Sequence, residues 1–210
     1  MAITMSQFES QLANAVSRRR ILWVDGVGGY LLADRDEVTL GQAIAGSSVD
    51  IGIVGDIRRK AGVIRRSGAD YLLQPLQATL LNGQAIDRAQ LLRHSDLFQF
   101  GERVRLRFTQ PHPLSATARL ELVGLGKFQP HVDAVLLMAD SCLIGPQANC
   151  HVRCPQWNPA SAPLTLVRRG QDWFFNATQE LLVHGVPQRG LIAVVPGLRL
   201  CGADFSLSIE

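Results

Sequence analysis

Three consecutive cations, Arg58, Arg59 and Lys60, could bind an anion. A guanidinium group presents paired N–H donors that match two oxygens of a phosphate or carboxylate, and lysine adds a compact positive charge. The chemistry indicated by these residues is therefore recognition of a phosphate. A solvated loop explains the same run of charge, so this alternative stays open.

Cys150, His151 and Cys154 form a second group that could do chemistry, because thiolate and imidazole ligate metal ions. A structural zinc site needs two such clusters, and the sequence has no second one. We therefore expect free thiols here, with no metal and no cofactor, and keep zinc as the less favoured alternative. Cys142 and Cys201 complete the four cysteines, and a reducing compartment would keep all of them unpaired.

Catalytic groups are not evident. Nucleophilic catalysis needs a serine or cysteine beside a base and a group that orients the base. The five histidines are scattered and none stands in a recognised motif around a nucleophile: His94, His112, His131, His151 and His184. The glycines of residues 25–29 lack the Gly-Lys-Ser/Thr ending of a phosphate-binding loop, which favours a hairpin turn. The sequence predicts a protein that is not an enzyme, with a metal-dependent or cysteine enzyme as a remote alternative.

The composition describes a chain that can bury a core. Of 210 residues, 47% are hydrophobic and 19% are charged, and the formal net charge is +3. Residues 1–125 carry 15 Lys and Arg against 12 Asp and Glu, whereas the rest carries six of each, so an anion-seeking surface belongs to the first half. A net charge this small does not imply that nucleic acid is a partner. No apolar run approaches the roughly 20 residues of a membrane span, and no secretory signal is seen, so we expect a cytoplasmic protein without a membrane partner.

Two kinds of element should position these residues. Ser6 and Glu9 fit a capping box, and apolar residues recur at helical spacing after it, which predicts an amphipathic helix over residues 7–19. Beyond residue 20, short apolar or alternating runs separated by turn residues predict strands. They lie at residues 21–24, 30–33, 37–40, 50–54, 61–64, 71–73 and 97–108. Residues 102–108 alternate strictly between arginine and apolar side chains, which is typical of a half-buried strand in an antiparallel sheet.

The chain also repeats itself. Landmarks in the first half recur in the second half in the same order, at offsets of 101 to 104 residues, which predicts two copies of one all-β unit. The matched pairs are Gly41 and Gly145, Val63–Arg66 and Leu166–Arg169, Tyr71–Leu73 and Trp173–Phe175, Leu81–Gly83 and Val183–Gly185, and Gly101 and Gly202. We expect an N-terminal arm over residues 1–19 and two β-sandwiches over residues 20–125 and 126–210.

At these residues the chain resembles the forkhead-associated (FHA) domain family. The resemblance covers residues 20–110 and rests on the order and spacing of several strings: Val38–Gln42, Val49–Ile51, Asp56–Ile64, Tyr71–Leu73, Leu81–Gly83 and Leu91–Gly101. Over residues 130–210 it rests mostly on the internal repeat. FHA domains are β-sandwiches that bind phosphothreonine peptides through loops at one end. The resemblance therefore implies two tandem FHA-like sandwiches behind a short helix.

The expected phosphate pocket departs from the family pattern. Gln42 stands where the family usually has arginine, Arg58 where it has serine, and Ala61 where it has histidine. Asn82-Gly83 matches the Asn-Gly that touches the bound peptide in the family, although the same dipeptide is typical of a hairpin turn without a ligand. In the second copy His184 replaces that asparagine, so we expect no phosphate binding there.

The function expected from the sequence is a non-catalytic protein-interaction module with a degenerate phosphothreonine pocket. Its candidate ligand-binding residues, which follow from the resemblance and the cationic run, are Gln42, Arg58, Arg59, Lys60, Asn82 and Gly83. The alternative is a working phosphothreonine reader that uses Arg58, Arg59 and Asn82. The partner is a protein or a phosphopeptide, and self-association stays open.

Overall fold

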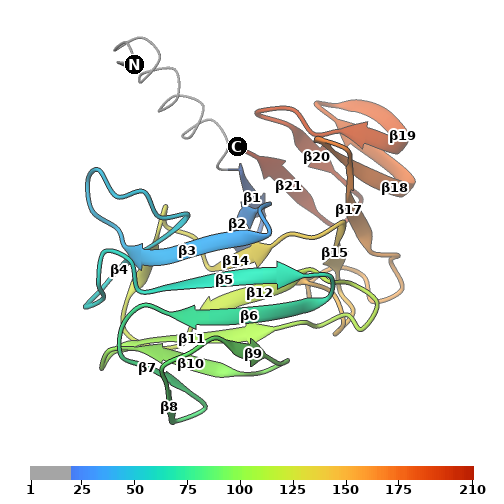
Figure 1. The fold of residues 1–210 in the computed structure, drawn as a ribbon. Coiled ribbons are helices and arrows are strands. Elements are labelled where there is room, and N and C mark those ends of the chain that lie inside the picture. Colours follow the sequence, from blue (N-terminus) through green and yellow to red (C-terminus); the bar gives the residue numbers. More distant parts are fainter. Residues whose placement is uncertain (1–19) are drawn as a thin grey trace.

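The computed structural model describes residues 20–210, and all of their regular secondary structure is β-strand (Figure 1). The predicted helix over residues 7–19 lies outside the described residues. Each strand expected from the sequence in the first half is confirmed, with one refinement. The run 97–108 forms two strands, because the chain turns at residues 101–103 and Gly101 takes the positive φ of 59° that this turn requires.

The strands form two sheets. One has six strands, in the order β13 (Lys127–Gln129), β4 (Ile51–Val54), β3 (Glu37–Gln42), β5 (Gly62–Ser67), β6 (Asp70–Pro75) and β9 (Gln90–Leu92). It packs against β7 (Thr79–Leu81), β8 (Gln84–Ile86), β10 (Leu97–Phe100), β11 (Val104–Thr109), β12 (Ala118–Leu122) and β14 (Ala134–Leu137), which belong to the other sheet. The expected alternation is confirmed over residues 104–108, because Val104, Leu106 and Phe108 are fully buried while Arg105 and Arg107 are exposed. Glu102 and Arg103 belong to the preceding turn instead.

The other sheet has 15 strands and continues into the second half of the chain. Its remaining members are β1 (Arg20–Val24), β2 (Gly28–Ala33), β15 (Ser141–Gly145), β16 (Val152–Arg153), β17 (Leu164–Arg169), β18 (Asp172–Val183), β19 (Val186–Ala193), β20 (Arg199–Cys201) and β21 (Ser206–Ile209). Among residues 20–210 no helix is long and apolar enough to cross a membrane.

The same order of pairings recurs in the two halves. In the first half β3 pairs with β4 in parallel and with β5 in antiparallel orientation, and β5 pairs with β6. In the second half β15 pairs with β16 in parallel and with β17 in antiparallel orientation, and β17 pairs with β18. Gly41 and Gly145, which the sequence repeat matches, stand in β3 and β15.

Strand β1, from the first predicted unit, pairs with a strand of the second unit, and β13, from the second predicted unit, pairs with β4 of the first. β1 pairs with β21, near the far end of the chain, and β12 takes the place next to β11 (Figure 1). β2 and β14 pair in parallel between them, with Tyr30 opposite Ala134. That pair differs by 104 in residue number (134 − 30), as do Gly41 and Gly145 (145 − 41).

Side-chain packing follows these pairings. Leu22 and Val24 of β1 join the core of the second half, with Trp157 and Trp173. Ala118 and Leu120 of β12 join the core of the first half. The second core is therefore completed by β1, from the beginning of the first half, and the first core by β12. The parallel pair of β2 and β14 lies between these two strands in the sheet.

Candidate functional site

Three connections of the first half meet at one end of the sandwich. They are the β4–β5 loop (residues 55–61), the β6–β7 loop (76–78) and the β10–β11 turn (101–103). The backbone N–H of Arg58 donates to the side-chain oxygen Oε1 of Gln77 at 2.9 Å, which ties the first loop to the second. The backbone N–H of Gly101 donates to the carbonyl of Ala78 at 3.1 Å, which ties the turn to the same loop.

These connections line a shallow, open depression of about 330 Å³, which we call the loop-end pocket. Its lining consists of Asp56, Ile57, Arg58, Gln77, Ala78, Gly101 and Glu102. Main-chain and side-chain amides, one guanidinium and two carboxylates are thus gathered around a small concave surface. A surface of this kind suits a short polar segment or a single side chain of a partner.

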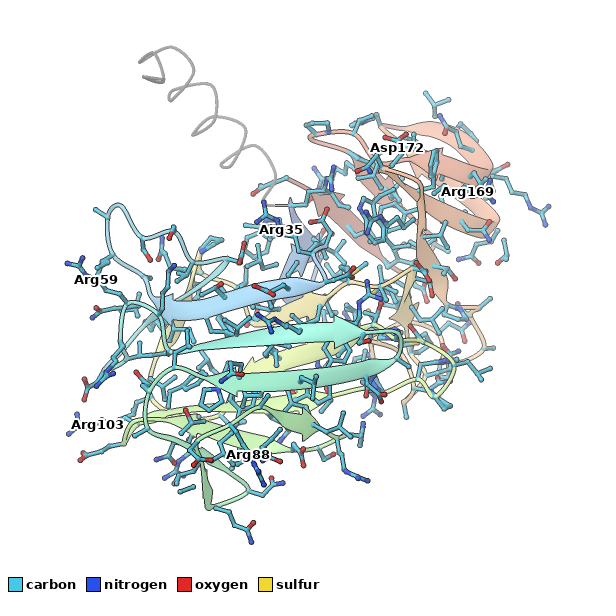
Figure 2. All side chains as sticks on the ribbon, in the orientation of Figure 1. Arg35, Arg59, Arg88, Arg103, Arg169 and Asp172 are labelled. Atoms are coloured by element: carbon cyan, nitrogen blue, oxygen red, sulfur yellow. The ribbon has the colours of Figure 1, made fainter. Side chains whose placement is uncertain are left out.

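Cations surround the loop-end pocket. Arg58, Arg59 and Lys60 are all exposed, and Arg103 follows directly after the lining residue Glu102. Figure 2 shows Arg59 and Arg103 projecting from the same end of the sandwich. We call these four residues the cationic rim. Among the residues described, the ion pairs engage Arg20, Arg35, Arg65, Arg66 and Arg119, and none engages the cationic rim.

Gly41 sets the path of the cationic loop. A Cβ at this position would overlap the carbonyl oxygen of Arg59, so only glycine lets the β4–β5 loop lie directly on β3. The backbone N–H of Gln42 then donates to the carbonyl of Arg58 at 2.9 Å. Close packing of the loop on β3 therefore fixes the backbone from which the cationic side chains project.

The structure brings several of the sequence-predicted residues together. Gln42, Arg58, Arg59 and Lys60 all lie at this end, linked through the β3 contact just described. Ala61, where the family has histidine, is fully buried and donates its backbone N–H to the carbonyl of Leu40 at 2.8 Å. Its methyl group faces the core and offers nothing to a ligand.

Asn82 and Gly83 lie elsewhere, in the tight turn between β7 and β8. Both have positive φ, 50° and 83°, as the hairpin turn requires. The amide of Asn82 donates to Asp96 Oδ1 at 2.8 Å and accepts from the backbone N–H of Leu97 at 2.9 Å. This amide therefore holds a turn at the opposite end of β7 from Gln77 and Ala78.

Sequence reasoning missed most of the residues that line the loop-end pocket. Gln77 and Ala78 stand in a short connection with no distinctive pattern. Glu102 and Arg103 were visible as the start of the alternating arginine strand, which assigned them to a sheet face instead of to the turn before it. The glycine at position 101 was the available signal, because a glycine between two alternating runs favours a turn.

The cysteine and histidine group of the second half is buried inside the core. Burial raises the pKa of the Cys154 thiol to about 12, and that of Cys142 further, so both thiols are protonated at neutral pH. His151 accepts from the backbone N–H of Leu143 at Nδ1, and burial lowers its pKa to about 4. Among residues 20–210 no three His, Cys, Asp or Glu side chains gather as a metal site would require, and the four cysteines there are free.

Comparisons with known proteins find similarity to a solved structure but no matching family. No family model matches the sequence, and no curated protein matches it either. Among solved structures, the chain is similar to the N-terminal FHA domain from EssC, a component of the bacterial Type VII secretion apparatus. The identity is 10%, the alignment covers 91% of this chain and 92% of that chain, and the TM-score is 0.24. At that TM-score the FHA relationship stays a resemblance, and the architecture that the structure itself establishes is all-β.

Proposed function

We propose that this protein is a non-catalytic interaction module that docks an acidic segment of another protein at the loop-end pocket. The observation that carries this proposal is the cationic rim: four exposed cations, none in an ion pair among the described residues, stand around one concave surface. Exposed cations that are not neutralised by neighbours remain available to the carboxylates of a partner.

In this proposal the partner segment does not have to carry phosphothreonine. The residues that differ from the family pattern are Gln42, Arg58 and Ala61, and the buried methyl of Ala61 cannot replace an imidazole. Asp56 and Glu102 also line the pocket, and their carboxylates disfavour the double negative charge of a phosphate. A carboxylate, with a single charge spread over two oxygens, fits between the rim cations with less repulsion.

A phosphothreonine reader is the second candidate. The exposed guanidinium groups of Arg58 and Arg59 favour it, because guanidinium binds phosphate through two parallel hydrogen bonds. Asn82 would have no direct part, since its amide is engaged with Asp96 and Leu97.

Peptide titration distinguishes the two candidates. Fluorescence anisotropy of the 210-residue protein with acidic, phosphothreonine and neutral peptides should show binding of acidic peptides that weakens as salt rises. Arg58→Ala with Arg59→Ala should weaken this binding at least tenfold, whereas the matched control Arg88→Ala with Arg169→Ala should not, because those arginines project from other faces (Figure 2). Binding of phosphothreonine peptides alone would favour the reader, and indifference to all peptides would contradict both.

We also propose that the two halves are copies of one β-sandwich unit that have exchanged their N-terminal hairpins. The recurring pairings support this, as does the offset of 104 residues across the β2–β14 contact. The proposal moves the start of the second copy from residue 126 to the start of β12 at Ala118. The second core would then be completed by β1 and β2.

A further inference from the structure

Three exposed apolar side chains lie beside the loop-end pocket. Val54 at the end of β4 is 51% exposed, Val123 just after β12 is 42% exposed, and Leu125 in the following turn is 69% exposed. Isolated exposed aliphatic side chains are ordinary on protein surfaces, so what matters is whether these three form one surface.

The backbone brings the three together. Lys127 of β13 is the partner of Val54 in β4, which places the turn containing Leu125 at the end of that strand. A Cβ on Gly126 would lie 3.2 Å from the carbonyl oxygen of Val54. Val123 donates its backbone N–H to the carbonyl of Arg105, so it lies against the first residues of β11. We call Val54, Val123 and Leu125 the apolar rim.

The apolar rim adjoins the cationic rim. A Cβ on Gly124 would lie only 2.6 Å from the carbonyl oxygen of Arg103, so the turn that carries Val123 and Leu125 packs on the backbone of a rim cation. Val54 is followed by Gly55 and then by Asp56, which lines the loop-end pocket. Lys127 adds another exposed cation next to Val54.

We propose that the apolar rim is the second part of the docking surface and takes an aliphatic side chain that flanks the acidic residues of the partner segment. This inference rests on the proposed function and adds to it the class of segment that is recognised. The charge of the surface is the argument for that occupant: Arg103 and Lys127, which adjoin the apolar rim, complement acidic residues that flank an aliphatic one.

A peptide fits this surface better than a lipid bilayer does. Asp56 and Glu102 stand among the cations and would repel the anionic headgroups of a flat membrane. A peptide can place its carboxylates away from them. The apolar rim also contains only aliphatic residues, whereas membrane-interface anchors are typically Trp and Tyr.

The test uses two acidic probe peptides that differ at one position, Glu-Glu-Glu-Leu-Glu-Glu and Glu-Glu-Glu-Ser-Glu-Glu. The leucine peptide should bind the 210-residue protein about tenfold more tightly, the order expected for partial burial of one aliphatic side chain. Val123→Ser with Leu125→Ser should abolish this preference and leave binding of the serine peptide unchanged. The matched control is Leu114→Ser, because Leu114 is 91% exposed and lies outside the apolar rim.

Each outcome has a distinct meaning. If the serine peptide binds but leucine adds nothing, or if the preference survives in the double variant, the inference is wrong and the proposed function stands. If neither peptide binds the parent protein, both fail. Sedimentation with phosphatidylserine vesicles that depends on Leu125 would also overturn the inference, in favour of a membrane surface. Far-ultraviolet circular dichroism checks that the variants fold.

Discussion

The side-chain oxygen of Gln77 lies 2.9 Å from the backbone nitrogen of Arg58 and accepts its hydrogen bond. The donor belongs to the cationic β4–β5 loop and the acceptor to the β6–β7 loop, so this one contact joins two walls of the loop-end pocket. The position of the cationic rim therefore depends on the neutral side-chain amide of Gln77, which acts by holding the loop.

Gln77→Ala should loosen this link. Loss of one intramolecular hydrogen bond costs about 1 kcal/mol, so urea denaturation should show a small decrease in the free energy of unfolding. Binding of acidic peptides should weaken more than that decrease suggests, because the rim cations lose their common frame. Gln77→Glu keeps an acceptor oxygen and should retain the free energy of unfolding, so an equal decrease of that free energy in both variants would contradict this role.

Gly41→Ala should destabilise the protein by about 2 to 3 kcal/mol, the order expected for a side-chain atom forced into packed structure. The reason is the overlap of the new Cβ with the carbonyl oxygen of Arg59. Gly68→Ala is the matched control, because its φ is +62° but nothing lies within 4 Å of its Cβ position. The control should cost only about 1 kcal/mol from backbone strain. Equal losses in thermal unfolding would show that the close approach to Arg59 does not matter.

Leu22→Ala and Leu120→Ala should destabilise opposite halves of the molecule. Leu22 is fully buried in the second core, although it stands near the start of the first predicted unit, and Leu120 is fully buried in the first core. Each substitution should cost about 2 to 5 kcal/mol. Hydrogen exchange should speed up mainly in residues 164–209 for Leu22→Ala and mainly in residues 37–109 for Leu120→Ala. The opposite distribution would disprove the exchanged strands.

Acid should destabilise the second core through His151. Burial lowers its pKa to about 4, below the ordinary value of 6.5, so the unfolded chain binds a proton that the folded protein rejects. Stability should be complete above pH 6.5 and should fall by about 3 kcal/mol between pH 6.5 and pH 4. His151→Gln removes the titrating group while keeping a possible acceptor for Leu143 N–H. Urea denaturation of this variant should show a smaller loss over that interval, and an identical loss would exclude His151 as the cause.

Local sequence signals predicted the strands well, because alternation and turn residues are local properties. Residues 104–108 show this, since alternate side chains are buried in β11 as expected. The position of β1 could not be predicted in the same way. Leu22 and Val24 would suit either core, and only the whole set of contacts decides that β1 pairs with β21.

The candidate site was predicted in part for a similar reason. The charges of Arg58, Arg59 and Lys60 are visible in any sequence, whereas Gln77 contributes through a contact with a residue 19 positions away. Asn82-Gly83 shows the opposite case: a dipeptide that matched a binding pattern supports a turn with both of its residues.

The pairing of β1 with β21 has a consequence for synthesis on the ribosome. Residues 37–137 can pack their core while the rest of the chain is still being translated, since that core draws all but a few of its side chains from this interval. The second core cannot be completed until Ile209 has emerged, so β1 lacks its partner β21 throughout the synthesis of the residues between them. During that interval Leu22, Val24 and Tyr30 lack their final neighbours, which makes the hairpin of β1 and β2 the segment that a nascent-chain chaperone would be expected to shield.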